Sequence, residues 1–234
     1  MRKNVSILEC TNRERGQRIR GICKKLVSTY GTPRHGNPYD PVDDLIYVIL
    51  STKTSLTMAK SLFDSLKTAY PNWDLCLGTS RKELEAIIKP GGLQQTRAGQ
   101  IRGALSKIRS DFGAIELSAL KGWDEASAEA YLTSLPGVSL KIAKCVMVYT
   151  LGFSVMPVDT HIYRVAKRLG WTEKNRADQC HGELEALVPA HRRHDFHVAC
   201  MAHGQQTCSP RGAECERCCI SDYCLDYNNR PRPS

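Results

Sequence analysis

Apolar side chains recur every three or four positions along most of the chain. Three groups with this spacing are Leu62, Phe63 and Leu66; Ile101, Leu105 and Ile108; and Ile162, Val165 and Leu169. This period is typical of an α-helix that buries one face. Residues 45–50 are apolar enough for a buried strand, but they follow a Pro-Val-Asp-Asp start that favours a helix N-terminus, and no second strand candidate could pair with them. The pattern therefore predicts an all-α protein.

Glycine and proline divide the chain into parts. The first forty residues are basic and only partly periodic, and they end in the Pro/Gly-rich stretch Gly-Thr-Pro-Arg-His-Gly-Asn-Pro, which is typical of a linker. We expect a compact helical core from about residue 43, and a second boundary between residues 153 and 158 before a cysteine-rich end. A chain of 234 residues is long enough for one large domain or two small ones.

The charge balance points to a polyanionic partner. The chain has 33 lysine and arginine residues against 24 aspartate and glutamate residues, which gives a net charge of +9. Such a balance favours nucleic acid or an anionic membrane surface. No apolar stretch reaches the length of a membrane span, and the start has no apolar run of signal-peptide length. We therefore expect no membrane insertion and an intracellular protein, cytoplasmic or at the nucleoid if bacterial, with reduced thiols.

Cysteines are concentrated near the end of the chain. Five of the eleven lie between residues 208 and 224. In a reducing compartment a metal site explains them better than a disulfide framework does. Cys208, Cys215, Cys218 and Cys224 form the pattern C-x6-C-x2-C-x5-C, which suits a tetrahedral sulfur site for zinc or an iron–sulfur cluster. Cys219 is also within reach, and the choice of Cys218 depends on spacing alone.

A tight turn joins two helical segments at Leu-Pro-Gly-Val-Ser-Leu-Lys, residues 135–141. Successive N–H groups at such a turn can bind a phosphate oxygen. A helix over residues 139–151 is about 18 Å long, and the next seven residues reach about 23 Å when extended. The chain can therefore return and bring Asp159 beside Lys141. Asp159 also suits the N-cap of a helix over residues 160–169.

These features together resemble the endonuclease III family of base-excision DNA glycosylases, in the helix-hairpin-helix superfamily. Leu-Pro-Gly-Val-x-x-Lys, Val-Asp-Thr-His and the four-cysteine spacing carry the resemblance, which runs from about residue 43 to residue 224. It implies two helical domains with DNA bound in the groove between them. One is a six-helix barrel with the hairpin, over residues 43–153. The other is an iron–sulfur domain made of residues 1–42 and 154–234.

The resemblance also implies the chemistry. Lys141 would attack C1′ of the damaged nucleotide, form a Schiff base and cleave the strand 3′ of the abasic site by β-elimination, with Asp159 as the catalytic acid. The base, an oxidised pyrimidine, would first be flipped out of the duplex. Cys208, Cys215, Cys218 and Cys224 would hold a [4Fe–4S] cluster. We expect a monomer on double-stranded DNA. Lys144, one helical turn beyond Lys141, is interpreted as solvated, with a contribution to the cationic field of Lys141 as the alternative.

Further DNA contacts follow from the same resemblance. They are expected from the hairpin and from the residue that ends the Val-Asp-Thr-His motif: Pro136, Gly137, Val138, Ser139 and His161. Leu93 stands where the family has a wedge that enters the duplex. Lys53 replaces the family's gap-filling glutamine, and Leu56 replaces an acid. Because a lysine can only donate hydrogen bonds, Lys53 is predicted to favour an orphan base with acceptors, guanine above all.

Ser139 stands where the family usually has glycine. It is predicted to weaken one phosphate contact, because a glycine turn conformation suits a β-carbon poorly.

Alternative functions stay open. A mismatch or adenine glycosylase has an acid on the helix before the wedge or lacks the hairpin lysine, whereas here that helix reads Leu-Ile-Tyr-Val-Ile-Leu and Lys141 is present. Removal of 5-methylcytosine, as in larger plant demethylases that share this core, is a second alternative. A DNA-binding or redox-sensing iron–sulfur module without catalysis is a third, and it would need neither Lys141 nor Asp159.

Overall fold

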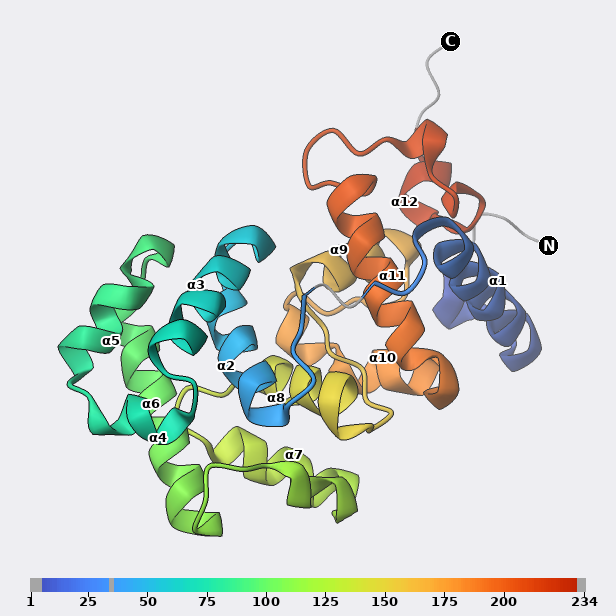
Figure 1. Ribbon diagram of the computed structural model, residues 1–234. Coiled ribbons are helices and arrows are strands. Elements are labelled where there is room, and N and C mark those ends of the chain that lie inside the picture. The colour runs from blue at the N-terminus through green and yellow to red at the C-terminus, as the bar shows by residue number, and fades with distance from the viewer. Residues whose placement is uncertain (1–5, 34–35, 231–234) are drawn as a thin grey trace. The chain divides into compact units, whose positions relative to one another are not determined.

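The computed structural model describes residues 6–33 and 36–230, and every regular element within these ranges is a helix (Figure 1). The predicted all-α class is therefore confirmed. The chain divides into two compact units. Residues 35–153 form one, called here the middle unit, and residues 1–34 with 154–234 form the other, called here the terminal unit. Among the described residues, no helix is long and apolar enough to cross a membrane.

The middle unit is built around a buried helix. Its α-helices are α2 (Pro41–Ser51), α3 (Leu56–Ala69), α4 (Trp73–Gly78), α5 (Arg81–Ile88), α6 (Gln94–Phe112), α7 (Glu125–Ser134) and α8 (Leu140–Val146). Short 3-10 helices occur at Lys89–Gly91 and Ser118–Gly122, and a π-helical turn, Met147–Leu151, continues α8. Helix α2 contacts α3, α6 and α8. This explains why residues 45–50 are apolar on every side, as expected for a helix with no solvent face.

Local signals fix where α2 begins. The side chain of Asp40 accepts hydrogen bonds from the backbone N–H groups of Val42 and Asp43, at 2.9 and 3.0 Å. Pro41 occupies the first helical position, where the missing N–H has no intrahelical partner to lose. The prediction of a helix rather than a strand for this segment is confirmed.

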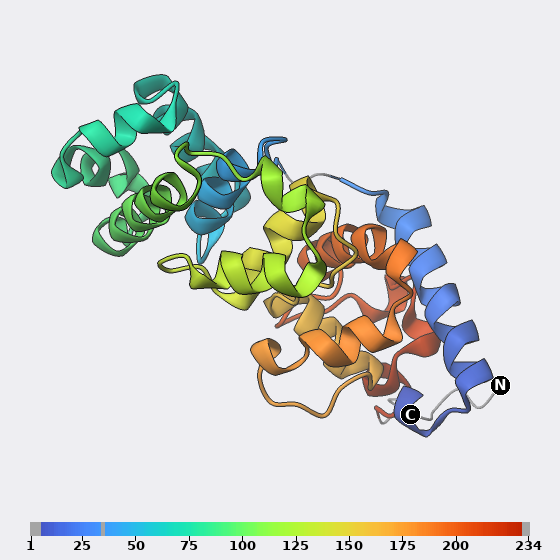
Figure 2. The same ribbon diagram turned by 90° about the horizontal axis from the view of Figure 1, so that it is seen from below.

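The terminal unit combines both ends of the chain. Its α-helices are α1 (Asn12–Tyr30), α9 (Thr160–Leu169), α10 (His181–Leu187), α11 (Arg193–Gln206) and α12 (Leu225–Asn228). Its 3-10 helices are Ile7–Glu9, Ala177–Gln179, Ala190–Arg192, Cys215–Arg217 and Ser221–Tyr223. Helix α1 lies alongside α11, and α11 contacts α9 (Figure 2). Trp171 and Phe196 stack in the shared core with ring centroids 5.4 Å apart.

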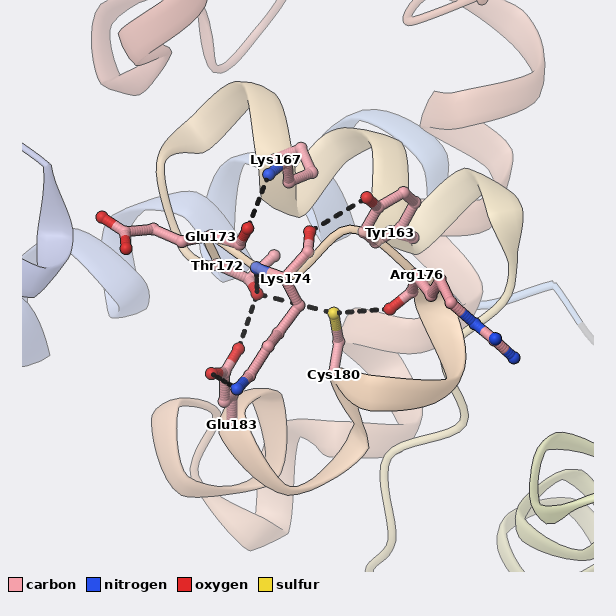
Figure 3. Close-up of polar contacts among 8 residues, drawn as sticks. All are labelled: Tyr163, Lys167, Thr172, Glu173, Lys174, Arg176, Cys180 and Glu183. Atoms are coloured by element: carbon pink, nitrogen blue, oxygen red, sulfur yellow. Dashed lines mark hydrogen bonds and ion pairs between the residues drawn. The ribbon is translucent and has the colours of Figure 1, made fainter.

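The loop between α9 and α10 is held to both helices by polar contacts (Figure 3). Tyr163 Oη and Lys167 Nζ, both on α9, donate to the carbonyl oxygens of Lys174 and Glu173, at 3.0 Å each. Thr172 Oγ1 donates to a carboxylate oxygen of Glu183 on α10 at 2.6 Å. These bonds hold α9, which begins at Asp159, against the rest of its unit.

An ion pair joins the two helices of the hairpin. Lys144 on α8 is 4% exposed, and its Nζ lies 3.1 Å from Oε2 of Glu129 on α7. The interpretation of Lys144 as a solvated side chain is therefore wrong. This burial could not be predicted from residue spacing, because Glu129 reaches Lys144 only when α7 folds back on α8. A buried charge with its partner is a structural feature, and removing one member leaves the other uncompensated.

Candidate DNA-binding and catalytic site

The hairpin turn between α7 and α8 takes its shape from Gly137. This residue has a φ of 77°, and a β-carbon added there would lie 2.2 Å from Cγ of Gln100. The N–H of Val138 donates to the carbonyl oxygen of Leu135 at 3.1 Å and closes the turn. Only glycine adopts this left-handed conformation without strain. The turn leaves Pro136 and Gly137 exposed, so backbone groups there are open to a ligand.

Ser139 does not occupy the glycine-type position. Its backbone is extended, with φ −78° and ψ 165°, and its hydroxyl accepts from the N–H of Ile142 at 3.4 Å. It is the N-cap of α8, a position that favours serine. The prediction that a β-carbon at Ser139 strains the turn is therefore wrong, because the positive φ falls at Gly137.

Lys141 follows this cap directly. It is the second residue of α8 and is half-buried, while the next residues, Ile142 and Ala143, are buried in the middle unit. The N-terminal turn of a helix carries partial positive charge. A primary amine at this position can act as a nucleophile. The prediction that Lys141 and Asp159 face each other stays a prediction.

Asp159 begins α9 in the terminal unit. Its Oδ1 accepts from the N–H of Ile162 at 2.8 Å, so it is the N-cap predicted from the sequence, and it is half-buried. Cys200 on α11 is fully buried, and burial raises the pKa of its thiol well above the ordinary value, with the charge of Asp159 as a second cause.

The extended segment before Asp159 is held by side chains that the sequence analysis missed. The carbonyl oxygens of Met156 and Pro157 lie 3.1 Å from Nδ1 of His181 and of His197, respectively. The N–H of Met156 donates to Oε1 of Glu185 at 2.8 Å. Buried backbone groups outside helices need such partners. Residues 155–158 are apolar and lack helical periodicity, so the sequence indicated that their backbone needs hydrogen-bond partners but not which residues supply them.

His161 lies within the first turn of α9 and is half-buried. Its Nδ1 is 3.1 Å from Nη2 of Arg164. A guanidinium has no acceptor, so it is the donor, and the neutral imidazole then carries its proton on Nε2. Arg164 itself donates to the carbonyl oxygens of Gly204 and Cys208, at 2.6 and 2.8 Å. His161 is thus oriented with a second nitrogen able to donate to a ligand.

The two predicted lesion-reading residues share an unusual backbone. Lys53 has a φ of 57° and Leu93 a φ of 52°, and they are the only non-glycine residues with positive φ in the described part of the chain. Lys53 is exposed, and Leu93, the N-cap of α6, is 53% exposed despite its apolar side chain. A left-handed residue with a β-carbon costs roughly 1–2 kcal/mol. Such strain persists where the surroundings impose it, and it is frequent at functional sites.

The four predicted cysteine ligands line one cavity of the terminal unit, in which about 390 Å³ is free of protein atoms, some of it open to solvent. Its described lining includes Cys208, Cys215, Cys218 and Cys224, and it does not include Cys219. Nη1 of Arg168 donates to Sγ of Cys208 at 3.0 Å. Apolar side chains from α9, Val165 and Leu169, also line the cavity.

This donor set consists of four cysteine side chains, which suit zinc or an iron–sulfur cluster. Within the described ranges, no three His, Cys, Asp or Glu side chains are close enough together to hold one metal ion. A tetrahedral zinc site draws its four sulfurs to about 2.3 Å from one centre. A four-iron cluster binds one thiolate at each of four irons, so its ligands surround a larger body. The four cysteines that line the cavity supply the ligand type that both groups need.

Comparison with known proteins identifies the family. Residues 46–190 match the family described as "HhH-GPD superfamily base excision DNA repair protein". The chain is 28% identical over 215 residues to endonuclease III of Synechocystis sp., which covers 92% of this chain and 93% of that one. It is 30% identical over 165 residues to the Arabidopsis thaliana protein "Putative DNA glycosylase At3g47830", which covers 70% of this chain and spans 56% of that relative's length.

Solved structures show the same fold. The complex titled "Structure of a non-covalent Endonuclease III-DNA Complex" matches with a TM-score of 0.80 at 23% identity, and the match covers 91% of this chain and 96% of that one. A thermostable thymine-DNA glycosylase matches with a TM-score of 0.77 at 25% identity, covering 93% of this chain and 98% of that one.

The chain belongs to the HhH-GPD superfamily of base excision DNA repair proteins. Within that superfamily it is an endonuclease III-like DNA glycosylase, an enzyme that acts on DNA. The resemblance read from the hairpin, the Val-Asp-Thr-His motif and the cysteine spacing is thereby confirmed.

Proposed function

We propose that this glycosylase is bifunctional: it removes an oxidised pyrimidine from double-stranded DNA and then cleaves the strand 3′ of the abasic site. The observation that carries the proposal is the position of Lys141, a half-buried primary amine in the first turn of α8, directly after the exposed hairpin. A monofunctional glycosylase activates water and has no use for an amine at this point. Asp159, a half-buried carboxylate at the start of α9, is the proposed partner in catalysis.

The proposed reaction proceeds in two stages. The amine of Lys141 attacks C1′ of the flipped nucleotide, and the bond to the base breaks with its electron pair leaving on the base. The carboxylate of Asp159 stabilises the positive charge that develops on the sugar. Loss of a proton from the nitrogen and opening of the ring give a Schiff base on Lys141. Removal of a proton at C2′ then expels the 3′ phosphate, and water releases the enzyme.

The hairpin is the proposed anchor for the backbone of the DNA. Pro136, Gly137, Val138 and Ser139 form a turn whose exposed end precedes a helix N-terminus, a geometry that suits a phosphate oxygen. His161, with its Nε2 free of the Arg164 contact, is a proposed second phosphate donor. Lys53 and Leu93 are the proposed gap filler and wedge. One copy of the chain carries every residue of this scheme, so we expect a monomer to act.

We propose that the terminal unit binds a [4Fe–4S] cluster through Cys208, Cys215, Cys218 and Cys224. Bound there, the cluster would cross-link residues 208–224 to one another, and its binding free energy would add to the stability of the fold. The donation from Arg168 to Cys208 and the apolar side chains of α9 support this assignment. Purified protein is expected to be yellow-brown with about four irons per chain. Colourless, active protein with stoichiometric zinc would contradict the cluster.

Borohydride trapping on abasic DNA tests the main proposal. The wild type is expected to form a covalent adduct, whereas Lys141→Gln and Lys141→Arg form none and still bind the duplex, because the hairpin contacts remain. Lys121→Gln is the matched control: it removes an exposed amine of the same unit that has no part in the proposed scheme, and it should trap normally. An adduct that survives in Lys141→Gln would assign the nucleophile to another amine.

A second candidate is removal of thymine mispaired with guanine. It is favoured by the similarity to a thymine-DNA glycosylase and by Lys53, whose donor-only side chain matches the acceptors of guanine. Turnover is compared on thymine glycol opposite adenine, thymine glycol opposite guanine, and a thymine–guanine mismatch. We expect the wild type to prefer guanine as the orphan base, and we expect Lys53→Gln to lose this preference. Equal preference in both proteins would mean that Lys53 does not read the orphan base.

A further inference from the structure

One buried arginine contacts the loop that carries the proposed wedge. Arg97 on α6 is only 2% exposed. Its Nη1 donates to the carbonyl oxygens of Gly91 and Gly92, both at 2.8 Å. These two residues immediately precede Leu93, whose own carbonyl oxygen accepts from the Arg97 N–H at 2.9 Å. The backbone on both sides of the Leu93 side chain is therefore bonded to Arg97.

The same guanidinium contacts the loop that carries the proposed gap filler. Its Nη2 donates to the carbonyl oxygen of Thr52 at 2.6 Å and to the hydroxyl of Thr54. Thr52 and Thr54 flank Lys53 on either side. The Arg97 side chain thus joins α6 to Thr52 and Thr54, which precede it by 45 and 43 positions in the sequence.

The chemistry of this contact requires an arginine. All four acceptors of the Arg97 side chain are neutral: three carbonyl oxygens and one hydroxyl. The two guanidinium nitrogens face different loops, and a rigid planar fork can serve both at once. A lysine ends in one nitrogen and cannot span both sets of acceptors. Burying a charge is costly unless its donors are satisfied, so the loops and Arg97 stabilise each other.

The two loops also contain Lys53 and Leu93, the two non-glycine residues that have a positive φ in the described part of the chain. We propose that Arg97 is a positioning residue: it holds both loops in the left-handed geometry that presents the wedge and the gap filler to the duplex as one unit. The inference rests on the proposed function of Lys53 and Leu93. It assigns to Arg97 no contact with DNA, because its side chain is buried and both terminal nitrogens donate to the two loops.

The physical consequence concerns base extrusion more than binding. An apolar wedge can unstack a base step only if the loop that carries it stays in place when the side chain is pushed between the bases. A flexible loop must first become ordered, and the free-energy cost of that ordering adds to the barrier for unstacking. Phosphate contacts at the hairpin do not involve Arg97. Loosening the loops therefore slows extrusion of the damaged base and leaves affinity for undamaged duplex nearly unchanged.

The first experiment needs no DNA. Lys53 is exposed, so trypsin can cleave the bond between Lys53 and Thr54 whenever the loop leaves its folded conformation. We expect Arg97→Lys to speed this cleavage by about tenfold, since the open state becomes more populated. The control is Arg102→Lys on the same helix, which likewise loses bonds to carbonyl oxygens, those of Cys76, Leu77 and Thr79, in a different region.

The second experiment measures extrusion. The probe is a duplex with 2-aminopurine beside an abasic-site analogue, mixed rapidly with the full-length protein. Arg97→Lys is expected to slow the fluorescence rise by about tenfold and to change affinity for undamaged duplex by less than about threefold. Thr54→Val, which removes one acceptor and keeps the shape of the side chain, should slow the rise by about threefold. In a Leu93→Ala background the effect of Arg97→Lys should largely disappear, because the two act through one wedge.

A third substrate separates this inference from the proposed function. Single-stranded abasic DNA requires no unstacking, so Arg97→Lys should cleave it at the wild-type rate. Wild-type protein that fails to cleave this substrate would contradict the lyase proposal and leave the trypsin result standing. The positioning role is overturned if Arg97→Lys and Arg102→Lys give equal trypsin cleavage at Lys53, or if single-stranded and double-stranded cleavage fall together.

Discussion

The hairpin turn allows a quantitative prediction for Gly137→Ala. The substitution places a β-carbon on a residue with a φ of 77°, which costs roughly 1–2 kcal/mol. The same β-carbon would lie 2.2, 2.6 and 2.7 Å from Cγ, Cδ and Nε2 of Gln100, so that side chain must leave its rotamer. A displaced rotamer adds about 0.5–1.5 kcal/mol. The expected loss of unfolding free energy is therefore about 1.5–3.5 kcal/mol.

Thermal unfolding monitored by circular dichroism measures this loss. For a chain of 234 residues, about 1.5–3.5 kcal/mol corresponds to a fall in Tm of roughly 3–14 °C. Gly152→Ala is the matched control, because Gly152 has a φ of 81° and nothing within 4 Å of an added β-carbon. It should show only the backbone part, about 1–2 kcal/mol. In the Gly137→Ala background, Gln100→Ala should recover the steric part of the lost stability, so that only the backbone part remains.

Two results would refute this reasoning. A Tm for Gly137→Ala within 1 °C of the wild type would show that the turn does not need a left-handed residue. Equal losses in Gly137→Ala and Gly152→Ala would show that Gln100 gives way without cost. Binding to abasic duplex provides a functional readout: Gly137→Ala should weaken it, since the exposed N–H groups of the turn shift, whereas Gly152→Ala should not.

Three further predictions concern named contacts. Because the Ser139 hydroxyl caps α8, Ser139→Ala should lower the free energy of urea unfolding by about 1 kcal/mol, and Ser139→Gly should lower it by only a few tenths. A higher stability of Ser139→Gly than of the wild type would instead support strain at this position. Glu129→Gln should cost about 1–3 kcal/mol of unfolding free energy, a value lowered because the Glu129 side chain is 34% exposed. Lys144→Met should cost less, because it removes the buried charge itself. A larger loss for Lys144→Met than for Glu129→Gln would contradict this interpretation of the ion pair. Burial raises the pKa of the Cys76 thiol from 9.0 to about 11. The unfolded chain therefore loses this proton first, and stability falls as the pH rises from 9 to 11; Cys76→Ala should flatten that slope, and an unchanged slope would rule out Cys76 as its source.

Features that depend on neighbours in sequence were predictable. The helical periods, the helix over residues 45–50 and the cap at Asp159 follow from spacing and residue type, and all are present. The grouping of Cys208, Cys215, Cys218 and Cys224 around one cavity also followed from spacing, since all four lie within seventeen consecutive residues. Such signals are local: a helix end or a ligand spacing is complete within a few residues.

Contacts between distant residues were decided only by the tertiary structure. Lys144 is buried because α7 brings Glu129 to it, and Gly137 rather than Ser139 takes the left-handed position because the turn closes at Leu135. Arg97 had one sequence signal, a charge in phase with the apolar face of its helix at Ile101 and Leu105. Its four acceptors could not be read from the sequence. A buried polar group is satisfied by whatever the fold places beside it, and periodicity records which face is buried but not which residues lie opposite.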